Sequence, residues 1–236
     1  MRTLGWIAIG GLGIGIASLS FAYALGGRDL HRLPFDFAST ASCGDGTKAG
    51  GPSVRRLTWD NGDAIELSLP GTVYFRAGQG SDIVVRGSPD LVANVEVRGS
   101  RLTLDCRGWT AGRDLEITLP GRAFRHIGLF GSGKLVMENV SQPDLALRIG
   151  GSGTVRAQGS VNQATIKVSG SGEARLGDLA MKQLTVDISG SGKVEAAPKD
   201  TADVKISGSG DVKLLSRPAN LTSKVAGSGR ITHAAP

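Results

Sequence analysis

Six serines recur in the second half of the chain, each between two glycines, and a hydroxyl in so constant a setting suggests a nucleophile. The common strained elbow for a serine nucleophile has a Gly-x-Ser-x-Gly sequence, and none of the six has that flanking pattern. A residue that returns in every repeat is better explained by a turn that returns in every repeat. We therefore expect no catalytic role for Ser132, Ser152, Ser171, Ser191, Ser209 and Ser228.

The histidines and the acidic residues do not indicate a metal site. His31, His126 and His233 are far apart in the sequence, and no Cys or His cluster has the spacing of a zinc site. A calcium-binding solenoid would carry an aspartate at a fixed point of each turn, whereas only Glu173 and Asp211 are acidic among the residues that follow the tripeptides. We therefore expect no metal and no cofactor.

Solenoids that cleave polysaccharides need carboxylates, or a carboxylate and a base, that converge on the substrate. Asp178, Asp187, Asp200 and Asp203 lie in the central repeats, but each follows its tripeptide by a different number of residues. Side chains at such unlike positions are not expected to converge. We predict that the protein is not an enzyme and keep a carbohydrate-active enzyme as the least favoured alternative.

The Gly-Ser-Gly tripeptides mark an internal repeat, which is the main evidence for the fold. They begin at residues 131, 151, 170, 190, 208 and 227, at spacings of 20, 19, 20, 18 and 19. Such repeats are typical of solenoids, whose units stack on one another. Aliphatic residues alternate on both sides of each tripeptide, so each coil is predicted to have a strand, a glycine corner and a second strand. The predicted structural turns are Gly131, Gly133, Gly151, Gly153, Gly170, Gly172, Gly190, Gly192, Gly208, Gly210, Gly227 and Gly229.

Apolar and polar residues also alternate with a period of two before the repeats, for example at Ile65 and Leu67. No helical periodicity is present there. These patterns predict an all-β fold, a single-stranded parallel β-helix or solenoid with coils of about 19 residues. The solenoid is predicted over residues 54–236, with irregular first coils over 54–120 and Gly-Ser-Gly coils over 121–236.

The N-terminus has the features of a targeting segment. Arg2 precedes an uncharged stretch, residues 3–27, that is long enough to span a bilayer as a helix. Ala22-Tyr23-Ala24 also has the small-x-small pattern of a signal peptidase site. We predict that residues 1–27 form an apolar helix, either an uncleaved inner-membrane anchor or a cleaved signal peptide, and that residues 28–53 form a flexible linker. Both alternatives export the rest of the chain to the periplasm or the cell surface.

Export gives a meaning to the two cysteines, because thiols outside the cytoplasm tend to be oxidised. Cys43 and Cys106 could form a disulfide that ties the linker to the solenoid. The alternative is two unpaired cysteines, with Cys106 as a small core residue in the alternation of Leu102 and Leu104. The sequence leaves both open.

Basic residues recur at outward positions, three before the tripeptides and five after them, interrupted by Asp187 and Glu195. They predict a mostly positive ridge beside the corners, which an anionic polymer or membrane surface could bind. The alternative is that these charges only keep an exposed sheet soluble. No aromatic residues interleave with them, so nucleic acid is not an expected partner. The ridge residues are Arg148, Arg156, Lys167, Arg175, Lys205, Lys213 and Lys224.

The corners, such as Gly190-Ser191-Gly192-Lys193-Val194, and the stretch from Leu115 to Pro120 resemble a bacterial family. It is the putative auto-transporter adhesin, head GIN domain family, a domain of unknown function with a β-helical fold. The resemblance covers about residues 60–233. It implies a β-helix and an adhesin-like role at the cell envelope. We expect no translocating domain after the last coil, and therefore not a complete autotransporter.

These observations favour a noncatalytic cell-envelope protein, an adhesin-like module for an extended ligand such as a polysaccharide or a partner protein. A structural spacer or self-assembling module is the main alternative, because stacked strands have open ends that another copy can pair with.

Overall fold

The computed structural model describes residues 51–106 and 115–233, which belong to a compact unit spanning Thr40–Pro236. The predicted leader of residues 1–27 and the linker up to residue 50 lie outside the described residues. Within the described ranges, no helix is long and apolar enough to cross a membrane. The predictions of a signal peptide or anchor therefore stay predictions.

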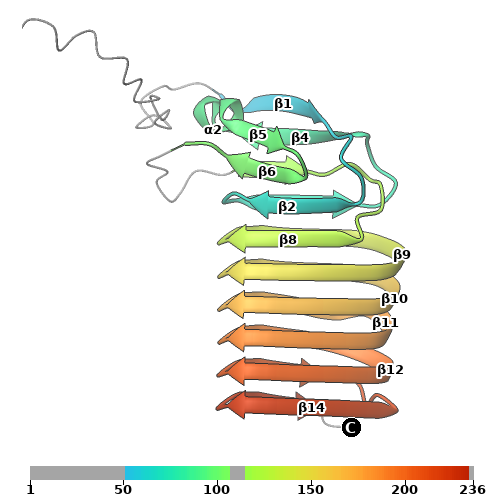
Figure 1. The fold of residues 1–236 in the computed structure, drawn as a ribbon. Helices are drawn as coiled ribbons and strands as arrows, with labels where there is room; N and C mark the ends of the chain where they lie inside the picture. The colour runs from blue at the N-terminus through green and yellow to red at the C-terminus, as the bar shows by residue number, and fades with distance from the viewer. Residues whose placement is uncertain (1–50, 107–114, 234–236) are drawn as a thin grey trace, which may run out of the picture. The chain divides into compact units, whose positions relative to one another are not determined.

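The prediction of an all-β solenoid is confirmed. Each long strand runs from one corner to the next and pairs in parallel with the coil before it and the coil after it, so that Ile166 lies beside Leu147 and Val186. The stacked arrows of Figure 1 show this arrangement. The strands of the repeat region are β8 His126–Gly131, β9 Lys134–Gly151, β10 Thr154–Gly170, β11 Glu173–Gly190, β12 Lys193–Gly208, β13 Asp211–Leu214, β14 Asn220–Gly227 and β15 Arg230–His233.

Each coil contributes to two sheets. The segments that lead into the corners form a front sheet, which faces the viewer in Figure 1 and includes β8 and β14. The segments that leave the corners form a back sheet, which includes β13 and β15. Inward residues of both sheets make aliphatic ladders, and all the buried side chains among the described residues are hydrophobic.

The two glycines of a corner meet two different requirements. Gly170 has φ +113°, a conformation that a residue with a Cβ rarely adopts. A Cβ on Gly172 would lie 2.4 Å from Cγ2 of Ile149 in the coil before it. The corners also stack through hydrogen bonds, since the Ser171 N–H donates to the Gly151 carbonyl oxygen at 2.8 Å. Regular stacking therefore depends on glycine at both places.

The N-terminal coils are less regular than a parallel β-helix, which corrects part of the prediction. β2 Ala64–Ser68 and β3 Thr72–Arg76 stack in parallel on β8 and β9. However, β1 pairs with β4, β4 with β7, and β5 with β6 in antiparallel register. A period of two marks a strand but not the direction of its partner, so the sequence could not show these pairs. Their bounds are β1 Ser53–Thr58, β4 Asp82–Gly87, β5 Val95–Arg98, β6 Arg101–Leu104 and β7 Leu115–Thr118.

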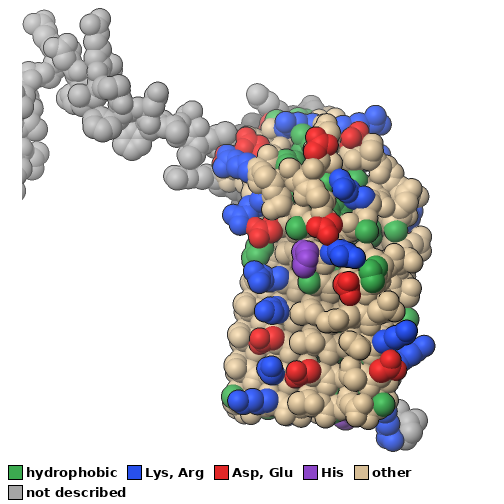
Figure 2. Space-filling view, turned by 45° about the vertical axis from the view of Figure 1, so that its right-hand side comes forward, with side chains coloured by type: hydrophobic (Ala, Val, Ile, Leu, Met, Phe, Trp, Pro, Cys, Tyr) green, Lys and Arg blue, Asp and Glu red, His purple; other side chains and the backbone are tan. Residues whose placement is uncertain are grey.

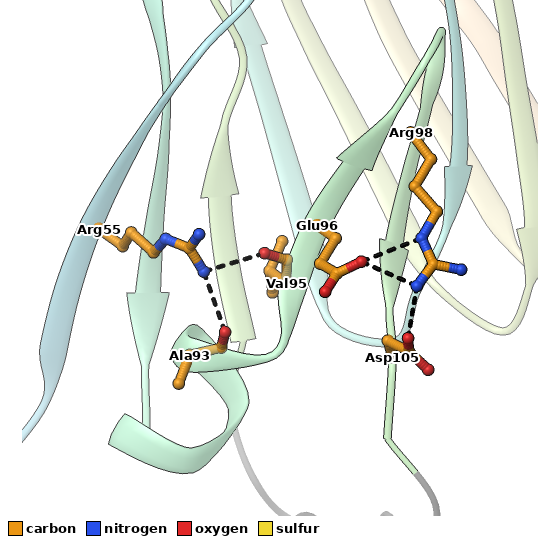
Figure 3. A network of polar contacts seen from close by, with 6 residues as sticks. All are labelled: Arg55, Ala93, Val95, Glu96, Arg98 and Asp105. Atoms are coloured by element: carbon orange, nitrogen blue, oxygen red, sulfur yellow. Dashed lines mark hydrogen bonds and ion pairs between the residues drawn. The ribbon is translucent and has the colours of Figure 1, made fainter. Parts of the chain in front are cut away.

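A short helix, α2 Pro89–Ala93, also contradicts the expectation that this part has no helix. It crosses from β4 to β5 at the N-terminal end of the solenoid and buries Leu91 and Val92. The Arg55 guanidinium fixes its last turn, donating to the carbonyl oxygens of Ala93 at 2.9 Å and Val95 at 3.2 Å (Figure 3). This end of the core is thus covered.

An ion pair cluster closes the neighbouring hairpin. Arg98 bonds to the carboxylates of Glu96 at 2.9 Å and Asp105 at 2.5 Å (Figure 3). Hydrogen bonds to Glu96, and then to Asp105, raise the pKa of the Arg98 guanidinium, so it stays charged at all relevant pH values. All three side chains are exposed, so the cluster orders β5 and β6 more than it stabilises the fold.

Candidate ligand-binding face

The outward residues of the front sheet form a column along the stacking direction. Arg148, Lys167, Asp187, Lys205 and Lys224 are successive Cα partners, one from each coil, and are called here the front column. Figure 2 shows such a column of basic side chains, with one acidic side chain among them. Adjacent strands are about 4.8 Å apart, so the column is a regular row of charges.

The remaining ridge residues lie on the back sheet. Arg156, Arg175, Glu195, Lys213 and Thr232 are partners in the same way and are called here the back column. The seven predicted ridge residues therefore belong to two columns on two sheets, one on either side of the corners.

Ion pairs distinguish the two columns. On the back sheet, Arg175 makes two hydrogen bonds to Glu173, at 2.8 and 3.0 Å, and Lys213 lies 3.6 Å from Glu195. The hydrogen bond from Arg175 is the largest factor that lowers the pKa of Glu173, so this carboxylate stays ionised. Two of the three basic residues of the back column, Arg175 and Lys213, therefore have a close counter-ion, and only Arg156 has none within 4.0 Å among the described residues.

The front column keeps more of its positive charge. Lys205 lies 3.9 Å from Asp203, at the limit of an ion pair. Among the described residues, no carboxylate is within 4.0 Å of Arg148, Lys167 or Lys224. Exposed basic charge without a close counter-ion is what an anionic ligand would meet, so the front sheet is the better candidate face.

A hollow of about 500 Å³ lies at the N-terminal end of the front column. Gly128 lines the hollow, and its Cα partners are Glu66 on β2 and Arg148 on β9. His126 and Phe130 stand two residues before and after it on β8, on the same outward side. Lys167 also lines the hollow, which therefore joins the front column.

Phe130 was missed by the sequence analysis, which found no aromatic residue among the basic ones. Its ring lies close against two glycines: Cε2 is 2.8 Å from where a Cβ of Gly128 would be, and Cδ1 is 2.7 Å from that of Gly150. The ring is half-buried, with the sheet backbone under it. The sequence does contain this information. Phe130 alternates with the inward residues of its strand and so points outward, and Gly150 is at the equivalent position in the next coil.

The other residues weighed for chemistry do not converge. The six corner serines are exposed along the edge between the sheets. Asp203 contacts Lys205, and Asp187 belongs to the front column. His126 borders the hollow, His233 ends β15, and His31 lies outside the described residues. Within the described ranges, no group of three or more His, Cys, Asp or Glu residues is arranged to hold a metal ion.

The disulfide between Cys43 and Cys106 stays a prediction, since Cys43 lies outside the described residues. Cys106 follows β6 and packs, partly buried, against the core. Its position is compatible with a tie between the first coils and the preceding segment.

Stacked coils with two faces and an exposed row of basic side chains define the architectural class of this protein as a repeat-built β-solenoid. Residues 62–218 match the family described as putative auto-transporter adhesin, head GIN domain, and the chain belongs to that family. This confirms the resemblance seen in the repeat motifs. The description of the family favours an adhesin-like protein of the cell envelope or surface.

Solved structures share the fold. A putative adhesin from Bacteroides fragilis superposes with a TM-score of 0.60 and 18% identity, covering 78% of this chain and 97% of its own. A putative lipid binding protein from Parabacteroides distasonis has a TM-score of 0.50 and 18% identity, covering 79% of this chain and 98% of its own. No curated protein matches the chain. At these identities the likeness establishes the fold alone.

Proposed function

We propose that this protein is a noncatalytic envelope module that binds an extended acidic polysaccharide along the front sheet. The observation that carries the proposal is the front column, in which Arg148, Lys167 and Lys224 have no close counter-ion among the described residues. In this proposal residues 1–27 export the chain as a signal peptide or anchor it in the membrane, and an envelope position gives access to surface polysaccharides.

The geometry of the column suits a linear polyanion. Its side chains come from successive coils at spacings of about 4.8 Å, on a sheet that is straight along the stacking direction. A flexible polysaccharide with a charge on every sugar can contact several basic side chains at once. After the first contact forms, the others form at a high effective concentration, so that weak contacts together give a useful affinity. Each exposed charge pair contributes only about 0.2–1 kcal/mol, so a useful affinity requires several pairs.

We expect the full-length protein to bind polygalacturonate but not the neutral polymer dextran. Because exposed charges are screened by salt, raising NaCl from 50 to 200 mM should weaken binding to polygalacturonate about tenfold. Isothermal titration calorimetry at several salt concentrations measures both effects. Equal binding to dextran, or binding to polygalacturonate that salt does not change, would overturn the proposal.

Self-association through the last coil is a second candidate function, supported by a separate observation. Every residue of β14 is exposed, and Leu221 and Val225 are 39% and 42% exposed at inward positions of the sheet. Among the described strands, only β12 pairs with β14, so its other edge has unpaired backbone groups. Repeat proteins need a polar cap at such an end.

The occupant that best fits this edge is β14 of a second copy, antiparallel about a two-fold axis at Ser223. In that register Leu221 of one copy faces Val225 of the other, so inward residues meet inward residues. Lys224 faces Thr222, and no like charges are opposed. At the N-terminal end, β1 pairs with β4 in antiparallel register, so it does not continue the parallel stack that a head-to-tail copy would extend.

If this pairing occurs, sedimentation velocity on the full-length protein should show a concentration-dependent dimer that Val225→Lys converts to a monomer. Thr185→Lys, which adds the same charge on an inner strand of the front sheet, should leave the dimer intact. A wild-type protein that stays monomeric up to high concentration, or a dimer that survives Val225→Lys, would exclude it.

A further inference from the structure

We propose that the hollow at Gly128 is a subsite for one acidic sugar ring, which stacks on Phe130 while Arg148 and Lys167 bind its carboxylate. This inference rests on the proposed function and names the part of the face that would recognise a sugar rather than charge alone.

Gly128 and Phe130 both line the hollow, and the missing side chain at Gly128 lets the Phe130 ring lie close to the sheet. Within the front sheet, Gly128 is surrounded by Glu66 and Arg148 on the adjacent strands and by His126 and Phe130 along its own strand. A volume of about 500 Å³ falls within the range of small-molecule sites in proteins. The hollow therefore has room for a sugar and polar groups on its sides.

Phe130 provides the flat apolar surface. Since its ring is pressed against the backbone at Gly128 and Gly150, one face is covered and its position is held by contacts on both glycines. The face of an aromatic ring carries partial negative charge, which attracts the weakly positive C–H groups of a pyranose.

The charges around the ring select an acidic sugar over a neutral one. Glu66 is held by Arg101, whose Nε lies 2.9 Å from Oε2 of the carboxylate, so it is already compensated. Arg148 and Lys167 have no carboxylate within 4.0 Å among the described residues. The net charge left at the hollow is positive, and a planar guanidinium matches a carboxylate well.

The remaining polar groups suit hydroxyls. His126 is exposed at the edge of the hollow, and Thr165 and Ser100 also line it. Each can donate or accept a hydrogen bond in the sugar plane, whereas the aromatic ring contacts the sugar from one face. A single ring held in this way would fix the register of a longer polymer on the front column.

The test uses the full-length protein and trigalacturonate, an acidic trimer too short to cover the whole column, with neutral maltotriose as the comparison. We expect Phe130→Ala to weaken trigalacturonate binding about tenfold. Gly128→Leu should weaken binding as much, because its Cβ would lie 2.8 Å from Cε2 of Phe130 and displace the ring. Tyr74→Ala is the matched control, because Tyr74 is an aromatic side chain, 39% exposed, on the back sheet.

Saturation-transfer NMR gives an independent readout, since irradiation of the ring protons should label the C–H groups on one face of the sugar in the wild type but not in Phe130→Ala. The inference fails if trigalacturonate does not bind, if Phe130→Ala and Gly128→Leu bind it as the wild type does, or if Tyr74→Ala weakens it equally. If polygalacturonate still binds in a salt-dependent way in those cases, the proposed function stands without the subsite. If polygalacturonate does not bind either, both fail.

Discussion

Replacing Gly190 with alanine should lower the free energy of unfolding by about 2–4 kcal/mol, a large loss of stability for the addition of a single methyl group. Gly190 has φ +124°, which strains any residue with a Cβ. The new methyl would also lie 2.6 Å from the carbonyl oxygen of Gly170 in the coil before it. That oxygen accepts a hydrogen bond from the Ser191 N–H at 2.8 Å, so moving it away costs a further contact.

Urea unfolding measures the stability of Gly190→Ala and of Ser191→Ala. The comparison shows whether the corner depends on the backbone conformation of the glycine or on the serine side chain. Ser191 is exposed, so its loss should change stability by less than about 0.5 kcal/mol. Because the coils are stacked as nearest neighbours, the glycine variant should also lower the cooperativity of the transition. Similar stability of Gly190→Ala and the wild type would contradict the stacking described here.

The repeat region could be predicted from the sequence because two independent signals coincide there. The glycines recur at a constant spacing, and the aliphatic residues keep the same parity relative to them, so a parallel stack is the arrangement that places Ile149, Val168 and Ile188 in one ladder. The last coil shows the limit of this argument. Val225 has the correct parity, yet it is 42% exposed because no further coil covers it.

The N-terminal coils could not be predicted in the same way. Ile117 pairs in parallel with Val73 on one side and antiparallel with Val85 on the other. All three show the same alternation in the sequence, since an inward residue is apolar whichever way its partner strand runs. Without a repeat to fix the register, strand direction is determined by loop lengths and by packing, for example of α2.

The candidate site was predicted in part. The basic residues alternate with the inward aliphatic residues, which predicted that they point outward in rows. The acidic residues that pair with some of them were not considered. Glu173 and Arg175 are two residues apart on one strand, so their side chains share a face and bond to each other. The hollow was missed because the sequence does not show that Phe130 packs over Gly128 or that Arg148 and Lys167 line the same space.

Removing the positive charges of the front column should weaken binding to polygalacturonate roughly 30-fold, since several exposed pairs of about 0.2–1 kcal/mol each are lost together. The variant combines Arg148→Gln, Lys167→Gln, Lys205→Gln and Lys224→Gln. Glutamine keeps much of the side-chain length and does not create a stacked row of carboxylates, which charge reversal would do beside Asp187. All four side chains project from the sheet into solvent, so the fold should be retained.

The back sheet supplies a matched variant, which changes the three basic residues of the back column and also Lys193, the Cα partner of Glu173 and Asp211. The substitutions are Arg156→Gln, Arg175→Gln, Lys193→Gln and Lys213→Gln. It removes the same amount of charge and leaves the same net charge on the protein. Long-range attraction is therefore equal in the two variants, and only the position of the lost charges differs. The melting temperature of each variant, measured by thermal denaturation, shows whether the fold is intact.

The most direct test of the account is the affinity of these two full-length variants for polygalacturonate, measured by calorimetry in the same low-salt buffer. We predict a loss of roughly 30-fold for the front variant and less than about threefold for the back variant, because Arg175 and Lys213 are already paired with Glu173 and Glu195. Equal losses in the two variants would mean that binding depends on net charge alone. A front variant that binds as the wild type does would contradict the assignment of the front sheet as the binding face.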